Sequence, residues 1–470
     1  MEINESYVKE IIEKVLAGTQ GESSAAAPAY QAKKQIGVFD TMTEALEAVQ
    51  KAYKLFRKYS VAQREEMITK IRELTLNEAE VMARMGVEET KMGRIADKVI
   101  KHQLVAKKTP GTEDLKANAM TGDDGLTLVE MAPFGVIGSI TPSTNPSETV
   151  ICNSIGMIAG GNAVVFNPHP NAKEVANYAV DLVNRGIIAA GGPENLVVTV
   201  KNPTKESSDE MMAAPCVRML VATGGPGVVR ALLSSGKKAI GAGAGNPPVI
   251  VDDTADIAKA GKDIVAGASF DNNLPCIAEK ECFAFENIAD ELIYYMQQNG
   301  AYLIKGEQIE QLKKVCLIEK NGKWGINKDW VGRDASKFLD AIGIKSDARL
   351  IICETDASHP FVQVEMMMPV LAIVRVKNIE EAIDLAVAAE HGNRHSAHIH
   401  SKNIDNLTAF AKAVETTIFV KNAPSYAGIG AGGEGYTTFT IAGPTGEGLT
   451  AAHSFTRQRR CVMVDGLHII

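Results

Sequence analysis

Cys276 is the residue of this 470-residue chain whose type and setting best suit nucleophilic chemistry. It follows Asn272-Asn-Leu-Pro, and Pro275 must end any preceding helix. At such a turn a thiol can gain thiolate character from exposed backbone N–H groups, and the thiolate is the nucleophilic form. The alternative is a buried, inert cysteine, an interpretation that also suits Cys282 in its apolar strand pattern.

Two glycine-rich segments could bind a phosphate group. Thr223-Gly-Gly-Pro-Gly227 follows a predicted strand and opens a predicted helix, and Gly241-Ala-Gly-Ala-Gly245 comes soon after. Glycine between a strand and a helix lets backbone N–H groups approach phosphate, although glycine clusters also mark ordinary turns. Neither segment matches the P-loop pattern.

Four histidines stand close together near the end of the chain: His391, His395, His398 and His400. A metal site needs its ligands on one side of a shared space. No single regular element presents all four histidines, no carboxylate pattern completes the set, and the chain has no C-x-x-C pair. We therefore predict no metal site.

Composition excludes several classes of protein. Hydrophobic residues make up 45% and charged residues 23%, which is ordinary for a globular protein. A formal net charge of −8 argues against a nucleic-acid groove. There is no continuous apolar run of about 18 residues and no secretory signal, and the seven cysteines have irregular spacing. We expect a cytoplasmic protein with reduced thiols and no membrane or nucleic-acid partner.

Residues 1–18 predict an amphipathic helix, followed by a flexible linker over residues 19–32. A short helix of this kind is marginal alone in water, so its apolar stripe needs a partner. It could dock on its own domain or serve as an address tag that binds another protein. The stripe consists of Ile3, Tyr7, Val8, Ile11, Ile12, Val15 and Leu16.

The rest of the chain alternates predicted strands with predicted helices, which favours crossover connections and mostly parallel sheets. We expect two α/β domains with a boundary near residue 245. Predicted helices cover residues 62–85, 172–189 and 227–234, and one begins at the capping box Thr41-Met-Thr-Glu44. Predicted strands cover residues 126–130, 136–141, 163–166, 196–200, 217–222, 249–251, 281–285, 370–376 and 418–420.

Four segments resemble the aldehyde dehydrogenase superfamily, and within it the CoA-acylating aldehyde dehydrogenases of bacterial microcompartments. The resemblance covers nearly the whole chain after about residue 35. The segments are Thr141-Pro-Ser-Thr-Asn145-Pro, the turn at Cys276, Glu365-Met-Met-Met-Pro-Val and Phe439-Thr-Ile-Ala-Gly-Pro-Thr-Gly-Glu-Gly448. The N-terminal helix and linker resemble encapsulation tags of microcompartment cargo enzymes, which favours the address-tag interpretation.

The resemblance implies roles for individual residues. Cys276 is the expected nucleophile, and the Asn145 amide is the expected oxyanion donor. Losing one oxyanion donor costs about 100- to 1000-fold in rate. Glu365 is expected to hold the nicotinamide ribose. The residues expected to bind NAD are Thr141, Pro142, Asn167, Thr223, Gly224, Gly225, Val228, Gly243 and Glu365.

Hydrolysing relatives carry a water-activating glutamate where this chain has the segment from Ala242 to Asn246. No residue from Gly241 to Gly245 is acidic. Water would be a poor acyl acceptor here, whereas a thiol such as coenzyme A needs less activation. The alternative is that the glycines serve only the turn and a base comes from another part of the chain.

The sequence also departs from the family pattern. One extra residue lies between Pro142 and Asn145, Val229 replaces a glycine, and Asn167-Pro-His-Pro170 lacks the acidic ribose reader. The choice between NAD and NADP therefore stays open.

The expected fold is α/β and aldehyde dehydrogenase-like. A Rossmann-type NAD-binding domain is assigned to residues 33–110 and 132–245, and a catalytic domain to 246–430. A β oligomerisation arm covers 111–131 and 445–470, where Cys461-Val-Met-Val and Leu467-His-Ile-Ile alternate like an edge strand.

The expected activity is oxidation of propionaldehyde or acetaldehyde to acyl-CoA through a cysteine thioester, with NAD. The expected assembly is a homodimer or homotetramer that binds microcompartment shell proteins through its N-terminal helix. Two alternatives are an acyl-phosphate reductase on the same fold and a non-catalytic cargo or scaffold protein.

Overall fold

The runs of aliphatic and β-branched residues form two parallel sheets, because a strand covered on both faces is apolar at nearly every position. The structure is a computed structural model that describes residues 35–470. The predicted N-terminal helix and linker lie outside these described residues. Each predicted strand from residue 126 to residue 420 coincides with an observed one, which confirms the α/β fold class.

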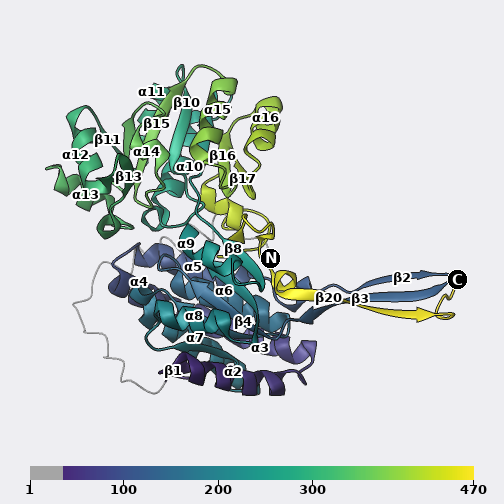
Figure 1. The fold of residues 1–470 in the computed structure, drawn as a ribbon. Coiled ribbons are helices and arrows are strands. Elements are labelled where there is room, and N and C mark those ends of the chain that lie inside the picture. Colours follow the sequence, from purple (N-terminus) through teal and green to yellow (C-terminus); the bar gives the residue numbers. More distant parts are fainter. Residues whose placement is uncertain (1–34) are drawn as a thin grey trace. The chain divides into compact units, whose positions relative to one another are not determined.

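The first sheet has six parallel strands in the order β1-β6-β5-β4-β7-β8 (Figure 1). The chain builds β4, β5 and β6 in one direction and then returns to place β7 on the other side of β4. This reversal opens a crevice at the carboxyl ends of β4 and β7, where such sheets bind ligands. The strands are β1 (Val38–Phe39), β4 (Val136–Thr141), β5 (Ala163–Pro168), β6 (Val197–Val200), β7 (Val217–Thr223) and β8 (Lys238–Ala242).

Within residues 35–470, eight α-helices accompany this sheet. The predicted capping box at Thr41 is present and begins α2. The prediction of a single helix over residues 62–85 is wrong. Two helices form there and meet at Glu78, whose carboxylate binds Arg185. The helices are α2 (Met42–Phe56), α3 (Val61–Asn77), α4 (Ala79–Thr90), α5 (Ile95–Lys108), α6 (Pro146–Ala159), α7 (Lys173–Ala189), α8 (Lys205–Ala213) and α9 (Pro226–Leu233).

The second sheet has seven parallel strands in the order β11-β14-β15-β10-β9-β16-β17. Its strands are β9 (Pro248–Val251), β10 (Glu281–Phe285), β11 (Ala301–Ile304), β14 (Leu350–Glu354), β15 (Val370–Val376), β16 (Ser396–His400) and β17 (Ile418–Lys421). Its helices are α10 (Ile257–Ser269), α11 (Ala289–Gln298), α12 (Glu307–Cys316), α13 (Ala335–Ala341), α14 (Pro360–Gln363), α15 (Ile379–Glu390) and α16 (Ile404–Val414). The hairpin of β12 (Leu317–Lys320) and β13 (Lys323–Ile326) follows α12.

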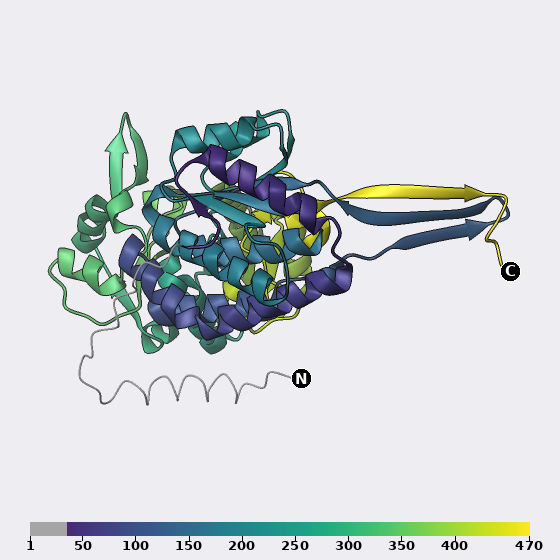
Figure 2. The same ribbon diagram turned by 90° about the horizontal axis from the view of Figure 1, so that it is seen from below.

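A three-stranded antiparallel ribbon joins residues that are far apart in the sequence. It consists of β2 (Asn118–Gly122), β3 (Gly125–Pro133) and β20 (Thr456–Val464), in the order β2-β3-β20. The ribbon extends away from both sheets (Figures 1 and 2). Residues 467–470 were expected to continue the strand pattern. The last paired residue of β20 is Val464, so these residues lie beyond the end of the strand.

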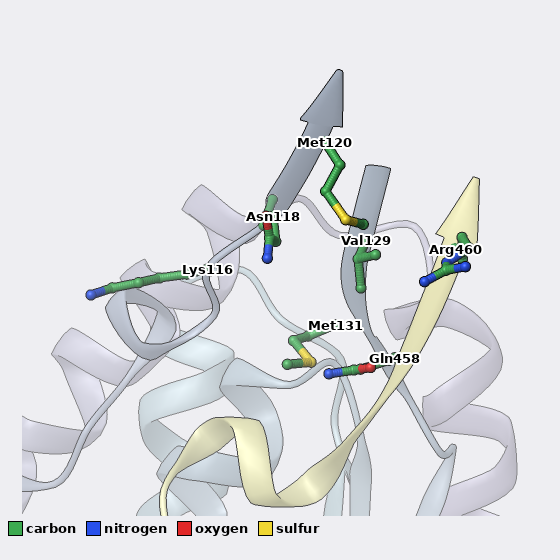
Figure 3. A pocket seen from close by; sticks show the side chains of 8 residues that line it. Lys116, Asn118, Met120, Val129, Met131, Gln458 and Arg460 are labelled. Atoms are coloured by element: carbon green, nitrogen blue, oxygen red, sulfur yellow. The ribbon is translucent and has the colours of Figure 1, made fainter. Parts of the chain in front are cut away.

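A hollow of about 550 Å³ lies on the ribbon (Figure 3). Its walls include Met120 and Met131 on neighbouring strands and Arg460 on β20. None of the expected site residues lines it. Within residues 35–470 no helix has both the length and the apolar character needed to cross a bilayer.

Candidate active site

The expected cofactor-binding residues gather at one edge of the six-stranded sheet. Thr141 ends β4, Asn167 lies near the end of β5, and Thr223 ends β7. The register pairs Ile140 with both Asn167 and Ala222, so these strand ends lie side by side. Pro142 follows β4, Gly224, Gly225 and Val228 follow β7, and Gly243 follows β8.

The glycines after β7 show a feature expected of a ligand site. A Cβ atom on Gly225 or Gly227 would contact nothing within 4 Å, and one on Gly224 would only reach Val228 at 4.0 Å. None of the three has a positive φ. Neither packing nor backbone conformation requires glycine at these positions, and the space beside them is open. The buried and unpartnered Thr141 hydroxyl is a further polar group at this edge.

Asn167 contributes less than expected. Its Oδ1 accepts a hydrogen bond from Ser207 at 2.6 Å, and its Nδ2 donates to the Thr204 carbonyl at 3.3 Å. These two bonds tie the end of β5 to the start of α8, so the Asn167 side chain is occupied within the protein. Its position next to Thr141 still places its backbone at the crevice.

The turn that carries Cys276 begins with three consecutive left-handed residues. Asp271, Asn272 and Asn273 have φ values of 47°, 57° and 65°. Asp and Asn adopt this region more easily than other residues with a Cβ atom. The Asn272 amide donates to Gly332 O at 2.9 Å, and the Asn273 amide donates to Ala268 O at 2.8 Å. The sequence Asp-Asn-Asn therefore fixes the backbone that leads to Cys276.

Asn145 caps α6 and is held by a buried lysine. Lys101 Nζ on α5 donates to Asn145 Oδ1 at 2.6 Å. This bond uses the oxygen of the amide and therefore fixes which way the Nδ2 group turns. The Nδ2 donor has Thr144 Oγ1 at 3.3 Å as its hydrogen-bond partner in the protein, a long contact that a substrate oxyanion could replace.

Lys101 also joins two segments that belong to different sheets. Its ammonium lies 2.6 Å from Asp271 Oδ2 and 3.0 Å from Glu148 Oε1, and all three side chains are at most 1% exposed. Lys98 binds the same Asp271 oxygen at 3.1 Å. This cluster connects the Asn145 segment to the Cys276 turn across roughly 130 residues of sequence.

Charge pairing sets the ionisation of this cluster. Burial by itself would lower the pKa of Lys101, but Asp271 and Glu148 raise it above its usual value. Burial would raise the pKa of Glu148, but Lys101, His102 and Lys98 lower it to about 2. Lys101 and Glu148 are therefore both charged at neutral pH.

Cys276 lies within a second group of polar side chains. Its side chain is partly exposed, and a Cβ atom built on Gly245 would meet the Cys276 carbonyl at 3.0 Å and the His395 ring at 2.9 Å. The Gly245 N–H donates to the Glu365 carboxylate. Gly245 is therefore the point where the loop before β9 meets Cys276, Glu365 and His395.

The surroundings of Cys276 raise the pKa of its thiol. Burial, followed by Glu365, raises this pKa to about 12, although Lys280, the Cys276 backbone N–H and Lys101 act to lower it. Burial also raises the pKa of Glu365 to about 7, against the effects of Lys280 and the Gly245 N–H. The backbone N–H alone therefore does not produce the expected thiolate.

Among the four histidines between residues 391 and 400, His395 lies at this site. Its Nδ1 lies 3.0 Å from Ser396 Oγ, and its Nε2 has no partner in the described protein. Burial, with Lys280, lowers its pKa to about 4, so the ring is neutral. Across residues 35–470 no group of three or more His, Cys, Asp or Glu is arranged to hold a metal ion.

The segment from Phe439 to Gly448 packs on the other glycine loop. Thr440 Oγ1 lies 2.9 Å from Thr223 Oγ1, and the Gly241 N–H donates to Thr445 Oγ1 at 3.2 Å. A Cβ atom on Gly243 would meet Pro444 at 3.1 Å. Packing of this segment therefore explains Gly243, whereas a Cβ atom on Gly241 would first meet Val229 at 2.7 Å.

Comparison with known proteins agrees with this geometry. Residues 31–447 match the sequence profile described as the aldehyde dehydrogenase family. The chain belongs to the aldehyde dehydrogenase family. This confirms the resemblance drawn from the four sequence segments.

Similar members of the family are named as acetaldehyde or propionaldehyde dehydrogenases. The acetylating acetaldehyde dehydrogenase EutE of Salmonella typhimurium is 48% identical, with complete coverage of both chains. A propionaldehyde dehydrogenase from the fucose utilisation microcompartment of Clostridium phytofermentans has a TM-score of 0.91 and 57% identity, covering 93% of this chain and all of that one. A Rhodopseudomonas palustris propionaldehyde dehydrogenase, solved with bound CoA and an acylated cysteine, has a TM-score of 0.90 and 56% identity, covering 92% and 99%.

Sequence reasoning missed three members of the site: Lys101, Lys280 and His395. Lys101 stands on a helix pattern where lysine is ordinarily exposed, and Lys280 lies between two glutamates. His395 was considered only as a metal ligand. A lysine placed among apolar helix positions, such as Lys98 and Lys101, is the signal that could have been noticed.

We predict that Lys101→Met lowers kcat about 10- to 100-fold with a smaller change in KM, because it frees the amide of Asn145 that should meet the oxyanion. The measurement is steady-state kinetics on protein whose folded fraction is known from circular dichroism. Lys98→Met is the matched control, since it removes a buried partner of Asp271 without touching Asn145. Equal losses of kcat in both variants would contradict this role of Lys101.

Proposed function

We propose that this aldehyde dehydrogenase is CoA-acylating and oxidises a short aliphatic aldehyde, propionaldehyde or acetaldehyde, to acyl-CoA with NAD. The main support is the loop from Ala242 to Asn246, which meets Cys276 at Gly245 and carries no acidic side chain. A site without a carboxylate in this loop favours a thiol over water as acyl acceptor. The names of the similar proteins agree with this reaction.

In the first half-reaction the partly exposed Cys276 thiol releases its proton to water, and the thiolate forms a C–S bond to the aldehyde carbon. The carbonyl π electrons move to oxygen, and Asn145 Nδ2 with the Cys276 backbone N–H stabilises that oxyanion. Lys101 keeps the amide turned for this purpose. The hydride then leaves the carbon, so the substrate is oxidised and a thioester to Cys276 remains.

NAD supplies the hydride acceptor when bound. The strand-end residues Thr141, Pro142, Thr223, Gly224 and Gly225 would hold it, with Val228, Gly243, Asn167 and Glu365 beside them. The open space over the glycines after β7 and the unpartnered Thr141 hydroxyl support this placement. Glu365 would hold the nicotinamide ribose, next to the Cys276 turn.

In the second half-reaction the CoA sulfur forms a bond to the acyl carbon, and the Cys276 C–S bond breaks to return the thiolate. The proton of the CoA thiol needs an acceptor. His395 is neutral and its Nε2 has no partner in the described protein, and the ring adjoins Gly245 beside Cys276. These observations support His395 as a relay that passes this proton to the departing Cys276 sulfur, because a ring with a pKa of about 4 does not keep the proton at neutral pH.

We predict that aldehyde and NAD give acyl-CoA when CoA is supplied and little free acid when CoA is withheld. Product analysis by mass spectrometry measures this, and Cys276→Ala should abolish turnover. Brisk formation of free acid without CoA would contradict the proposal. Turnover with inorganic phosphate in place of CoA, giving acyl phosphate, would favour the reductase alternative, and no turnover at all would favour a cargo or scaffold protein.

We also propose that residues 1–18 address the enzyme to the shell of a bacterial microcompartment. The amphipathic pattern of these residues and the microcompartment source of a similar structure support this role. A fusion of residues 1–18 to a fluorescent reporter should co-purify with shell proteins. The same fusion with Ile11→Glu should not, because the charge interrupts the apolar stripe, and failure of the unmodified fusion to co-purify would contradict the address role.

We propose further that the ribbon of β2, β3 and β20 is the oligomerisation arm of a homodimer or homotetramer. Strand β20 lies at the sheet edge and exposes Val462 and Val464 at 58% and 64%. Unpaired backbone groups and exposed apolar residues favour pairing with another copy.

We predict that Val462→Asp with Val464→Asp lowers the mass measured by sedimentation, because a charge on this edge opposes its burial. Ile318→Asp on the hairpin is the control, since Ile318 is also apolar and exposed but lies outside the ribbon. A monomeric unmodified protein would contradict the arm assignment.

A further inference from the structure

Lys280 is a fully enclosed ammonium group at the turn that carries Cys276. Its side chain is 3% exposed. Its Nζ donates to the Asn273 carbonyl at 3.0 Å, to Asn273 Oδ1 at 2.5 Å and to the Pro275 carbonyl at 3.3 Å. The last of these is the carbonyl directly before Cys276, so the charge lies within one peptide unit of the thiol-bearing residue.

These direct partners of Lys280 are all neutral oxygens, which separates Lys280 from the other buried lysines of the site. Lys98 and Lys101 each form an ion pair with Asp271 at 3.1 and 2.6 Å. In residues 35–470 no carboxylate forms an ion pair with Lys280. Neutral direct partners do not neutralise the charge of a buried cation. In a region of low dielectric its electrostatic field therefore acts strongly on neighbouring groups.

Several titratable groups interact electrostatically with Lys280. Glu279 and Glu281 flank Lys280 in the chain, and Glu365 faces it from the segment before β15. Glu281 is fully buried with no partner for either carboxylate oxygen, and Glu390 also interacts with it. The remaining groups that interact with Lys280 or with Cys276 are His395, His398 and Lys101.

We propose that Lys280 is a positioning residue that makes Cys276 ionisable: its ammonium, held by the Asn273 and Pro275 oxygens, supplies the positive charge that stabilises the Cys276 thiolate. Asn273 is in turn fixed by bonds to Ala268 O and Glu279 O, at 2.8 and 2.9 Å. The ammonium is therefore locked to the same turn as the thiol. This inference rests on the proposed function, in which Cys276 is the nucleophile.

The acid-base balance of the site agrees with this role. Burial lowers the pKa of Lys280, whereas Glu365, Cys276, Glu281 and Glu279 raise it. Burial raises the pKa of Glu281 well above its usual value and that of Glu279 to about 7. The raised pKa disfavours the ionised form of Glu281, so this carboxyl group competes less with Cys276 for the Lys280 charge.

The test is the pH dependence of Cys276 alkylation by iodoacetamide in the full-length protein without cofactor, followed on the Cys276 peptide by mass spectrometry. Lys280→Gln keeps hydrogen-bond donors for the turn but removes the charge. We expect its alkylation midpoint to move to higher pH, with alkylation at pH 7.5 slowed about tenfold for each pH unit of the move. Glu365→Gln should move the midpoint the opposite way, because it removes a negative charge.

Lys98→Met is the matched control, since it removes a buried ammonium of α5 that is already paired with Asp271 of the same turn, and its midpoint should stay near that of the unmodified protein. Lys280→Arg should restore most of the lost reactivity. If Lys280→Gln does not fold, the comparison is made between Glu365→Gln and the double variant, which restores the net charge of the site. Overlapping profiles with and without Lys280 in folded protein would overturn the inference, and because alkylation needs no turnover, this outcome is independent of the Cys276→Ala and product tests.

Discussion

The buried ammonium of Lys101 is the interaction on which the arrangement of the site depends. It holds the amide of Asn145, the proposed oxyanion donor, with the carboxylates of Glu148 and Asp271, at 2.6–3.0 Å. Removing one partner of a buried ion pair costs about 3–5 kcal/mol because the other charge is left uncompensated. The two halves of the catalytic geometry are therefore coupled: the donor cannot move away from the nucleophile turn without breaking this cluster.

The turn that leads to Cys276 has an unusual backbone conformation. Three left-handed residues in succession are unfavourable, and they persist because the side chains of Asp271, Asn272 and Asn273 each bind a different neighbouring segment. Lys280 also donates two hydrogen bonds to Asn273. The nucleophile is thus presented by a segment whose own side chains prevent it from relaxing.

Electrostatics and space together favour a thiol acceptor in this branch of the family. The loop that meets Cys276 at Gly245 is free of acids, and a methyl group at Gly245 would already clash with His395 and the Cys276 carbonyl. The acidic residue that does act on Cys276 is Glu365, whose pKa of about 7 leaves it only partly ionised. Lysine side chains instead supply positive charge near the sulfur. Positive charge suits a thiolate that attacks in the first half-reaction and leaves in the second.

The sequence by itself determined most strands and the fold class, because buried strands leave continuous apolar runs. Its motifs also led to the proposal of Cys276, through its turn, and of Asn145 and Glu365, through their resemblance to family motifs. It did not determine that helix 62–85 breaks at Glu78, or that Lys101, Lys280 and His395 belong to the site. Those assignments depend on contacts between residues such as Lys101 and Asp271, 170 positions apart, and only the packing of one sheet against the other brings such charges together out of water.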